Sequence, residues 1–462
     1  MKEKYKYLSK NVLLFSISGF VPKILSFLLV PLYTGILTTK EYGISDLIST
    51  TVMLLLPIFT CDIQDAVMRF AMDKKYSKKD TFTVGMQILL FGGIIVALGA
   101  FIIYKLKLIN GLYLLFATIM FITTAIYNSS SLFCRAIDKV KVITYASIIN
   151  SFVTLIANIV LLAVIPLGLT GYLIANSLGS FIALIYIFYK ANLIQYLRTR
   201  INKKLRKEML LYSFPLIFSV IAWWINNASD RYILTWMSGI AISGVYAVSY
   251  KIPNLLSMFQ NIFAQAWSIS AIKEFDKNDK DGFIGNTYTL MNFAMVAGCS
   301  FIMLINIPLA KILYSNEFYV AWKFVPPLLI AVVFNAMALF IGSVFTAVKD
   351  TKTLSYTTVI GGLINTICNF ILIYFFNAYG AAIATLIGYG ATLILRRVIL
   401  RKYICIRVNN KRDILCYMIL VAQMAIASLG WISIILQACL FICIVILYKT
   451  EFKKIILLFI KK

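Results

Sequence analysis

Fourteen apolar stretches occupy almost the whole chain, and this feature limits the fold more than any other. A helix needs about 20 mostly apolar residues to cross a hydrocarbon core of about 30 Å. Hydrophobic residues make up 61% of the 462 residues, enough for many such helices. We predict an all-α polytopic membrane protein with about 14 transmembrane helices, at 11–36, 44–66, 82–104, 109–132, 142–165, 169–189, 208–234, 242–270, 283–310, 324–347, 354–376, 379–400, 413–430 and 431–448.

Basic residues fall into every second gap between the apolar stretches. Of the 44 Lys and Arg residues, 36 lie at the two termini and in the even-numbered loops, when Arg396 and Arg397 at the end of the twelfth stretch are counted with the loop that follows it. Five lie in the odd-numbered loops, and three lie inside spans: Lys23, Arg231 and Lys251. Because cytosolic loops carry an excess of positive charge, both termini are predicted to be cytosolic. Anionic lipid beside these loops explains the net charge of +26 better than a nucleic-acid partner does.

The residue types that the chain lacks exclude several classes of enzyme. It has no histidine, so it lacks His-based acid–base catalysis and the commonest nitrogen ligand of metals. Its eight cysteines form no CxxC pair and are interpreted as packing residues, including Cys439 and Cys443 on one helix face. No Walker or Rossmann glycine pattern is present. We expect no catalytic residue, no metal and no cofactor.

Short sequence fragments of the first half recur in the same order in the second half, at an interval of roughly 200 to 210 residues. Small residues spaced by four, which let helices pack closely, occur in both halves. The common order of the pairs indicates a duplication. The pairs are Leu13–Ser16 with Leu210–Ser213, Gly43 with Gly244, Asp65–Ala66 with Gln265–Ala266, Phe133–Asp138 with Phe345–Asp350, and Gly171, Ala175 and Gly179 with Gly380, Ala384 and Gly388.

Six spans fall in each half, so both halves enter the membrane from the same side and are related by an axis along the membrane normal. We predict two six-helix pseudo-repeat bundles around a central cavity, plus two extra C-terminal helices. This architecture implies transport. The expected segments are an N-terminal six-helix bundle at 1–190, a basic cytosolic linker at 191–207, a C-terminal six-helix bundle at 208–400, and two extra helices with a basic cytosolic tail at 401–462.

Two lysines are predicted to lie near the middle of the membrane. Lys23 follows Pro22 in the first span, and Lys251 lies two residues before Pro253 in the eighth. Placing an ionised side chain at this depth costs about 2.5–3.5 kcal/mol of free energy, and such a side chain usually faces a water-filled cavity. The neighbouring prolines tend to kink the two spans. Either each lysine side chain extends far enough for its ammonium group to reach the polar layer at the membrane surface, or both lysines belong to an anion-binding cavity.

Polar and aromatic residues also occur on the seventh span. Arg231 follows Asp230 near the outer end of this span. The two residues are interpreted either as an interfacial ion pair or as part of the transport machinery. Trp223, Trp224 and Asn227 lie on the same span, and their aromatic faces and amide are suited to holding sugar rings. Bundle packing and interfacial anchoring are the commoner roles of such residues.

Charged side chains also gather at the cytosolic end of the second span. Asp62, Asp65 and Arg69 are interpreted as an intracellular gate or as a simple salt-bridge staple. Asp230 is a further candidate for a gating or coupling role.

Several segments together resemble a known family. They are similar to polysaccharide biosynthesis flippases of the Wzx type, within the multidrug/oligosaccharidyl-lipid/polysaccharide exporter superfamily. The resemblance covers essentially the whole chain in length, span count and order. The segments that carry it are Asn11–Phe15, Pro31–Tyr33, Glu41–Gly43, Asp65–Phe70, Ser213–Pro215, Asn227–Tyr232, Gly244–Tyr246 and Tyr250–Ile252.

The resemblance implies a flippase that moves undecaprenyl-diphosphate-linked oligosaccharide repeat units across the bacterial cytoplasmic membrane by alternating access. The units would serve the assembly of O-antigen, capsule or exopolysaccharide. Membrane lipid, a polysaccharide polymerase and chain-length machinery would be further partners. Related lipid II flippases carry cations, mostly arginines, in the first and eighth spans. The resemblance therefore assigns the diphosphate to Lys23 and Lys251, with Arg231, Asn227, Trp223 and Trp224 as further substrate-binding candidates.

Three other functions fit parts of the sequence. A lipid II flippase would use similar chemistry. A cation-coupled multidrug exporter of the same superfamily would usually need a buried carboxylate in the first span, where this chain has Lys23 and no acidic residue. A membrane glycan ligase or polymerase would need a large outer loop with catalytic residues, whereas the predicted outer loops are short.

Overall fold

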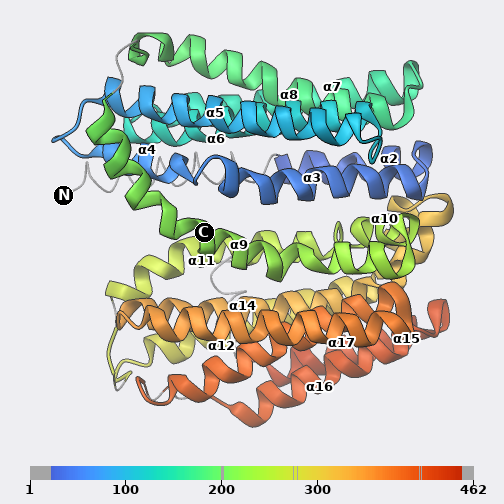
Figure 1. Ribbon diagram of the computed structural model, residues 1–462. Coiled ribbons are helices and arrows are strands. Elements are labelled where there is room, and N and C mark those ends of the chain that lie inside the picture. The colour runs from blue at the N-terminus through green and yellow to red at the C-terminus, as the bar shows by residue number, and fades with distance from the viewer. Residues whose placement is uncertain are drawn as a thin grey trace. The chain divides into compact units, whose positions relative to one another are not determined.

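The computed structural model describes residues 22–198, 202–273, 275–277, 279–404, 406 and 408–449 (Figure 1). All regular elements among these residues are helices. The chain forms two compact units, Met1–Ala228 and Ser229–Lys462, called unit 1 and unit 2 below. The predicted fragment Leu13–Ser16, most of the first half of span one and the basic C-terminal tail from 450 lie outside the described residues.

The division between the units falls inside one long helix, α9 (Lys203–Ser238). The sequence predicted a bundle boundary at 207/208, near the start of this helix. Leu205 and Met209 are buried in the core of unit 1, so the first turns of α9 belong to that unit. The rest of the helix contributes to unit 2 from Ser229 onward.

Unit 1 holds the first six predicted spans and the first part of the seventh. Its second span starts with a capping box, in which Thr38 Oγ1 accepts from the Glu41 N–H and the Glu41 carboxylate accepts from the Thr38 N–H. The elements are a helix at Pro22–Ile36 ending in α2 (Val30–Ile36), then α3 (Thr39–Phe59), α4 (Ile63–Met72), α5 (Lys78–Lys105), α6 (Gly111–Ala136), α7 (Val140–Asn158), the π-helix η1 (Ile159–Val164), α8 (Gly168–Lys190) and η2 (Leu193–Tyr196).

Unit 2 holds the remaining spans, and α14 is the most enclosed of its long helices. The eighth and ninth predicted spans are each split into two helices by a short break, and the eleventh and twelfth form one continuous helical hairpin. The elements are α10 (Ile240–Ser249), α11 (Pro253–Lys273), α12 (Phe283–Leu304), α13 (Asn306–Leu313), η3 (Asn316–Lys323), α14 (Val325–Ala347), α15 (Thr351–Leu400), α16 (Asn410–Ala427), η4 (Gly430–Ser433) and α17 (Ile434–Leu447).

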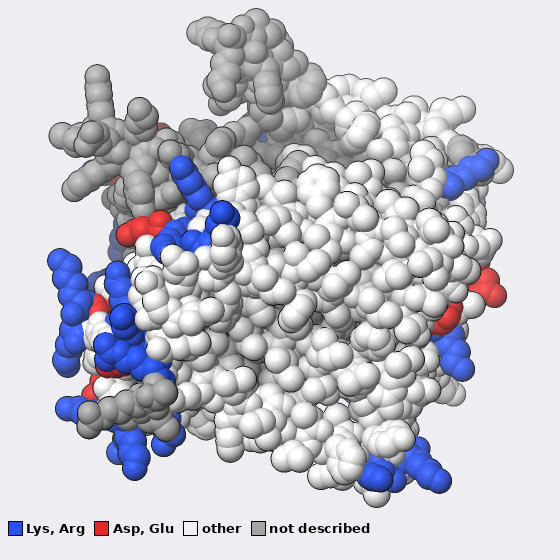
Figure 2. Space-filling view, turned by 90° about the horizontal axis from the view of Figure 1, so that it is seen from above, with Lys and Arg blue, Asp and Glu red and all other residues white. Residues whose placement is uncertain are grey.

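The surface confirms the predicted polytopic membrane protein. Figure 2 shows one face, on which Lys and Arg gather mostly at one end and a wide area without charged side chains lies between the two ends. On α5, the side chains of Phe91, Ile94 and Leu98 are between 58% and 66% exposed. Large apolar side chains are stable at such a surface when hydrocarbon, not water, surrounds it. Among the described residues, nine helices are long and apolar enough to cross a membrane, and α15 holds two predicted spans.

The same helical hairpin occurs in both units. In unit 1 a Cβ atom added to Gly171 of α8 would lie 2.5 Å from the carbonyl oxygen of Leu161. In unit 2 the two arms of α15 meet at a turn centred on Asn377, and a Cβ atom on Gly380 would lie 2.1 Å from the carbonyl oxygen of Leu372. The predicted ridges of small residues are therefore packing surfaces, as expected, and equivalent positions in the two halves make equivalent backbone contacts.

A buried arginine that the sequence reasoning assigned to a cytosolic loop fastens α14 to the hairpin of α15. Arg396 is 3% exposed. Its guanidinium donates to the carbonyl oxygen of Ala338 at 2.7 Å and to the hydroxyls of Thr357 and Thr358 at 3.1 and 2.8 Å. The planar fork of an arginine suits such divergent acceptors. Arg396 therefore contributes to the packing of unit 2.

Candidate functional site

The eighth span is interrupted at Lys251. Helix α10 ends at Ser249, and α11 begins at Pro253, which lacks a backbone N–H and is well suited to the first turn of a helix. Lys251 lies in the turn between them, half-buried, and its backbone N–H donates to the carbonyl oxygen of Val248 at 2.9 Å. At 1.5 Å per residue, this break lies about 15 Å along α10 from its start. Among the described residues, the Lys251 ammonium has no hydrogen-bonding or ion-pair partner.

Two tyrosines beside this break hold a buried carboxylate of the seventh span. Asp230 is 4% exposed, and its Oδ2 atom accepts from the hydroxyls of Tyr246 at 2.7 Å and Tyr250 at 2.9 Å. The Arg231 guanidinium carbon lies 5.0 Å from the centre of the Tyr250 ring. Tyr250 thus has Asp230 at its hydroxyl, Arg231 at its ring face and Lys251 as its chain neighbour. We call these residues, with Tyr246, the Asp230 cluster.

Asp230, Arg231 and Lys251 are site residues predicted from the sequence, whereas the two tyrosines of the cluster are not. Tyr246 and Tyr250 are spaced by four residues on α10, so both hydroxyls can point toward the same carboxylate. In the sequence, the signal for these tyrosines is their spacing of four residues immediately before Lys251. Two tyrosine donors are what a buried carboxylate requires, because an unpaired buried charge is costly.

The predicted sugar-holding residues of α9 belong to unit 1 and differ in accessibility. Trp224 is 8% exposed, and its Nε1–H donates to the carbonyl oxygen of Thr50 on α3 at 3.0 Å. Trp223 is 53% exposed. Asn227 is half-buried and donates to the carbonyl oxygen of Trp223 at 2.7 Å. Trp224 therefore packs α9 on α3, while the other two side chains remain partly accessible.

The two remaining predicted loci lie in unit 1. Lys23 is exposed on the helix at Pro22–Ile36, and no described residue pairs with its ammonium. Asp62 is buried at a left-handed break between α3 and α4, and one of its carboxylate oxygens accepts from Gln64 at 3.2 Å. Asp65 and Arg69 lie in the first and last turns of α4. Within the described part of the chain, no ion pair joins Arg69 to either aspartate.

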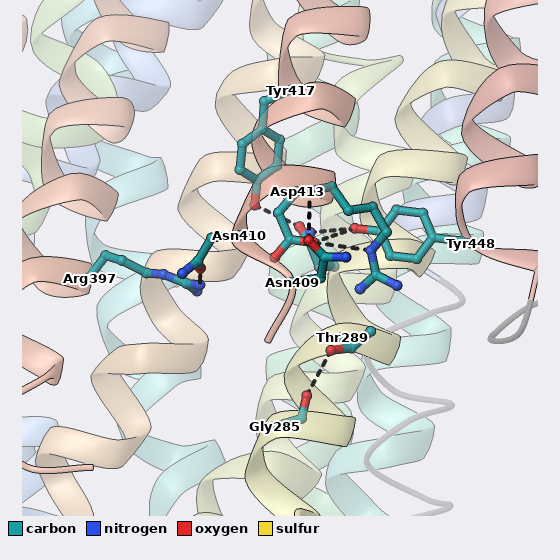
Figure 3. A network of polar contacts seen from close by, with 10 residues as sticks. Gly285, Thr289, Arg397, Asn409, Asn410, Asp413, Tyr417 and Tyr448 are labelled. Atoms are coloured by element: carbon teal, nitrogen blue, oxygen red, sulfur yellow. Dashed lines mark hydrogen bonds and ion pairs between the residues drawn. The ribbon is translucent and has the colours of Figure 1, made fainter. Parts of the chain in front are cut away.

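A second polar cluster in unit 2, which the sequence reasoning missed, fastens the two extra helices to α12 (Figure 3). The Tyr417 hydroxyl donates to Asn292 Oδ1 at 2.7 Å, and Asn292 Nδ2 donates to the Tyr448 hydroxyl at 2.8 Å. The Tyr448 hydroxyl donates to Asp413 Oδ1 at 2.9 Å, and Arg412 Nε lies 3.6 Å from the same atom. This chain of contacts connects α16 and the residue that follows α17 to α12. The only signal for this cluster in the sequence is the position of Asp413 at the start of a predicted span.

Comparisons with known proteins identify the family and the fold. A family model described as polysaccharide biosynthesis protein matches residues 8–269, more than half of the chain. No curated protein matches the sequence. No group of His, Cys, Asp and Glu able to hold a metal ion is present among the described residues.

Solved structures share the fold over most of the chain. A structure titled lipid II flippase MurJ, inward closed conformation, is 14% identical with a TM-score of 0.70, covering 96% of this chain and 100% of that chain. An inward-facing multidrug resistance MATE family transporter of the MOP superfamily is 13% identical with a TM-score of 0.65, covering 84% and 97%. A MOP superfamily transporter from Pyrococcus furiosus, whose title describes a binding pocket of reverse polarity, is 13% identical with a TM-score of 0.55, covering 85% and 95%.

Proposed function

This chain belongs to the polysaccharide biosynthesis protein family, and from that premise we propose that it is a flippase for undecaprenyl-diphosphate-linked oligosaccharide repeat units. It acts in the bacterial cytoplasmic membrane, with both termini in the cytosol. The translocated repeat units are used to assemble a surface polysaccharide such as O-antigen, capsule or exopolysaccharide. A polymerase and chain-length machinery then take up the units on the outer side.

The observation that carries the proposal is the uncompensated cation at the break of the eighth span. Lys251 lies between α10 and α11, and its ammonium has no partner among the described residues. A cation without a partner at this depth is costly unless water or an anionic ligand reaches it. Arg231 adds a second cation, over the ring face of Tyr250. A diphosphate is an anion that both side chains can bind.

Lys23 supplies the corresponding cation in the first half. Its exposure on the first helix supports a role in receiving the diphosphate. Trp223 and Asn227, both partly accessible, are the proposed contacts of the sugar rings. The equivalent hairpins of the two units support alternating access, in which two similar halves open in turn to the two sides.

The remaining acidic residues are proposed to control movement rather than to bind the glycan. Asp230 accepts a hydrogen bond from Tyr250, the residue before Lys251, so a rearrangement of this contact would change the surroundings of that lysine. Asp62, Asp65 and Arg69 are proposed as a gate at the break between α3 and α4.

The decisive experiment deletes the gene in its native host and restores it on a plasmid. Wild type, Lys23→Gln, Lys251→Gln and the double variant are compared at equal membrane levels. Lys105→Gln is the matched control, because Lys105 is an exposed lysine in the last turn of α5. We expect deletion to abolish surface polysaccharide and to leave repeat units inaccessible to a membrane-impermeant glycosidase added outside. The double lysine variant should fail to restore export, and the control should restore it.

Other outcomes would assign the chain differently. Normal polysaccharide with increased drug sensitivity would indicate a multidrug exporter. Accumulation of lipid II with normal surface glycan would indicate a lipid II flippase. Full export by the double lysine variant would remove the proposed role of the two cations while leaving the transported class intact.

A further inference from the structure

A cavity of about 430 Å³ lies inside unit 2, between the second arm of α15 and α16, with α12 and α14 behind it. This volume is within the range of about 300–1,000 Å³ typical of small-molecule pockets. Most of its wall is apolar, and its charged side chains lie near the end of α15 and the start of α16. The segment between these two helices is one of the basic loops predicted to be cytosolic. The wall includes Tyr288, Ile394, Arg397, Val398, Arg401 and Asp413.

One guanidinium in the wall has an unused donor. Arg397 is half-buried, and its guanidinium carbon lies 4.6 Å from the centre of the Tyr288 ring. Nη2 donates to Asn410 Oδ1 (Figure 3). Nη1 is buried and has no hydrogen-bond acceptor. A buried charged donor without an acceptor costs free energy, and an acceptor that entered the cavity beside Arg397 would offset this cost.

The wall of the cavity reaches the lipid-facing surface of the unit. Ile394, Val398 and Ile414 line the cavity and are 65%, 59% and 57% exposed. In a membrane protein, exposed aliphatic side chains of this kind contact acyl chains. Arg401, one turn beyond Arg397, also lines the cavity and is exposed. The entrance therefore combines an apolar side with cations at its basic end.

Among the described residues, one acidic side chain lines the cavity; its charge is partly compensated, and it offers one acceptor. Asp413 is 3% exposed, and its Oδ1 atom is engaged by Tyr448 and lies near Arg412. Its Oδ2 atom is buried without a donor. The cavity wall thus holds an unfilled donor on Arg397 and an unfilled acceptor on Asp413, with an excess of positive charge.

We propose that this cavity binds an anionic glycerophospholipid of the cytosolic leaflet, with a phosphate diester and a hydroxyl-bearing headgroup, as phosphatidylglycerol has. The phosphate accepts from Arg397 and Arg401, and the headgroup hydroxyl donates to Asp413. One acyl chain lies along the aliphatic entrance. The bound lipid fills the gap between α15 and α16 and so stabilises the attachment of the two extra helices to the repeat.

A bulk phospholipid fits this position better than the lipid that is flipped. Helix α16 lies outside the six-helix repeat, so this cavity has no counterpart among the repeated helices of unit 1. A transport route formed by two similar halves would use residues of both. The proposal goes beyond the proposed function, because it holds for any transported substrate.

The test measures lipid-dependent thermal stability of the purified full-length protein in detergent. Phosphatidylglycerol is titrated against phosphatidylcholine of the same acyl chains, undecaprenyl phosphate and inorganic phosphate. The variants are Arg397→Gln, Arg401→Gln and Val398→Trp. Of these, Val398→Trp narrows the entrance of the cavity and leaves every charge in place. Lys402→Gln is the control, since Lys402 is exposed on the same turn but does not line the cavity.

We expect phosphatidylglycerol to raise the apparent melting temperature to a plateau and phosphatidylcholine to do so weakly. The half-saturating concentration should rise about 10-fold in Arg397→Gln, from the loss of a charged hydrogen bond, and about 5-fold in Arg401→Gln. Val398→Trp should also weaken the effect, and Lys402→Gln should leave it unchanged.

Four results would overturn the proposal. Equal stabilisation by phosphatidylcholine, or an equal loss in Lys402→Gln, would remove the site. Saturation by inorganic phosphate at the same concentration would make it a site for a soluble anion. Tighter, Arg397-dependent stabilisation by undecaprenyl phosphate would make it a site for the carrier lipid.

Discussion

The close approach of the two arms of α15 makes Gly380 a position where one added methyl group should have a large effect. A Cβ atom there would lie 2.1 Å from the carbonyl oxygen of Leu372 and 2.4 Å from its carbonyl carbon. An ordinary carbon–oxygen contact is about 3.3 Å or longer, so the arms would have to separate locally by about 1 Å. The obstructing atoms belong to the backbone and cannot rotate away.

The expected size follows from two opposing terms. Overpacking of this kind costs about 1–3 kcal/mol. Alanine is favoured over glycine in a helix by about 1 kcal/mol, which offsets part of that cost. Gly380→Ala should therefore destabilise the protein by up to about 2 kcal/mol, or by up to about 8 °C in apparent melting temperature for a unit of this size. Gly171→Ala, with its contact at 2.5 Å, should act in the same direction and less strongly.

Gly99→Ala is the matched control. Gly99 lies in the interior of α5, and a Cβ atom added there meets nothing within 4 Å, so only the propensity gain remains. The melting temperature is followed by tryptophan fluorescence in one detergent at one scan rate, because such unfolding is commonly irreversible. If Gly380→Ala were as stable as Gly99→Ala, the close packing of the hairpin would be refuted.

Three further predictions concern single contacts. Arg396→Lys should lower stability by about 1–3 kcal/mol, because an ammonium cannot serve the separate acceptors that the guanidinium reaches; a wild-type melting temperature would contradict this role. Hydrogen bonds from Thr353 and Tyr403 lower the pKa of Asp350 below its usual 3.8, so their stabilisation is full above that pH and is lost as the pH falls through the lowered value. Asp350→Asn should thus destabilise the protein near neutral pH, with a difference from wild type that shrinks in melting curves below about pH 4; a pH-independent difference would count against it. Trp224→Phe should cost about 1 kcal/mol through loss of its indole hydrogen bond to α3, whereas Trp223→Phe, at an exposed position, should change the melting temperature little.

Local patterns in the sequence were sufficient to predict the helices. Each predicted span overlaps a described helix or pair of helices, because hydrocarbon requires long apolar segments whose backbone groups are satisfied internally. The glycine ridges predicted close packing correctly, since their spacing of four places small residues on one face. The break at Lys251 was signalled by Pro253, which cannot donate a backbone hydrogen bond.

Contacts between distant segments were not readable in the same way. Arg396 was counted with a cytosolic loop because it stands near the end of an apolar run, yet its guanidinium reaches residues on two other helical segments. The partners of Asp230 and Asp413 are tyrosines, which are common in apolar spans and give no periodic signal. Trp224 and Trp223 are adjacent and identical in type, and only the packing of α3 makes one buried and the other exposed.

Composition and spacing alone are sufficient to identify a helical membrane protein with a duplicated half, and they predict cations inside its spans. These properties follow from the apolar length that a membrane requires and from the cost of charge in hydrocarbon, each of which acts along the chain. Which polar side chains satisfy one another depends instead on how the helices pack. A hydrogen bond depends on distances of about 3 Å between groups that are far apart in sequence, and those distances exist only once the helices have packed.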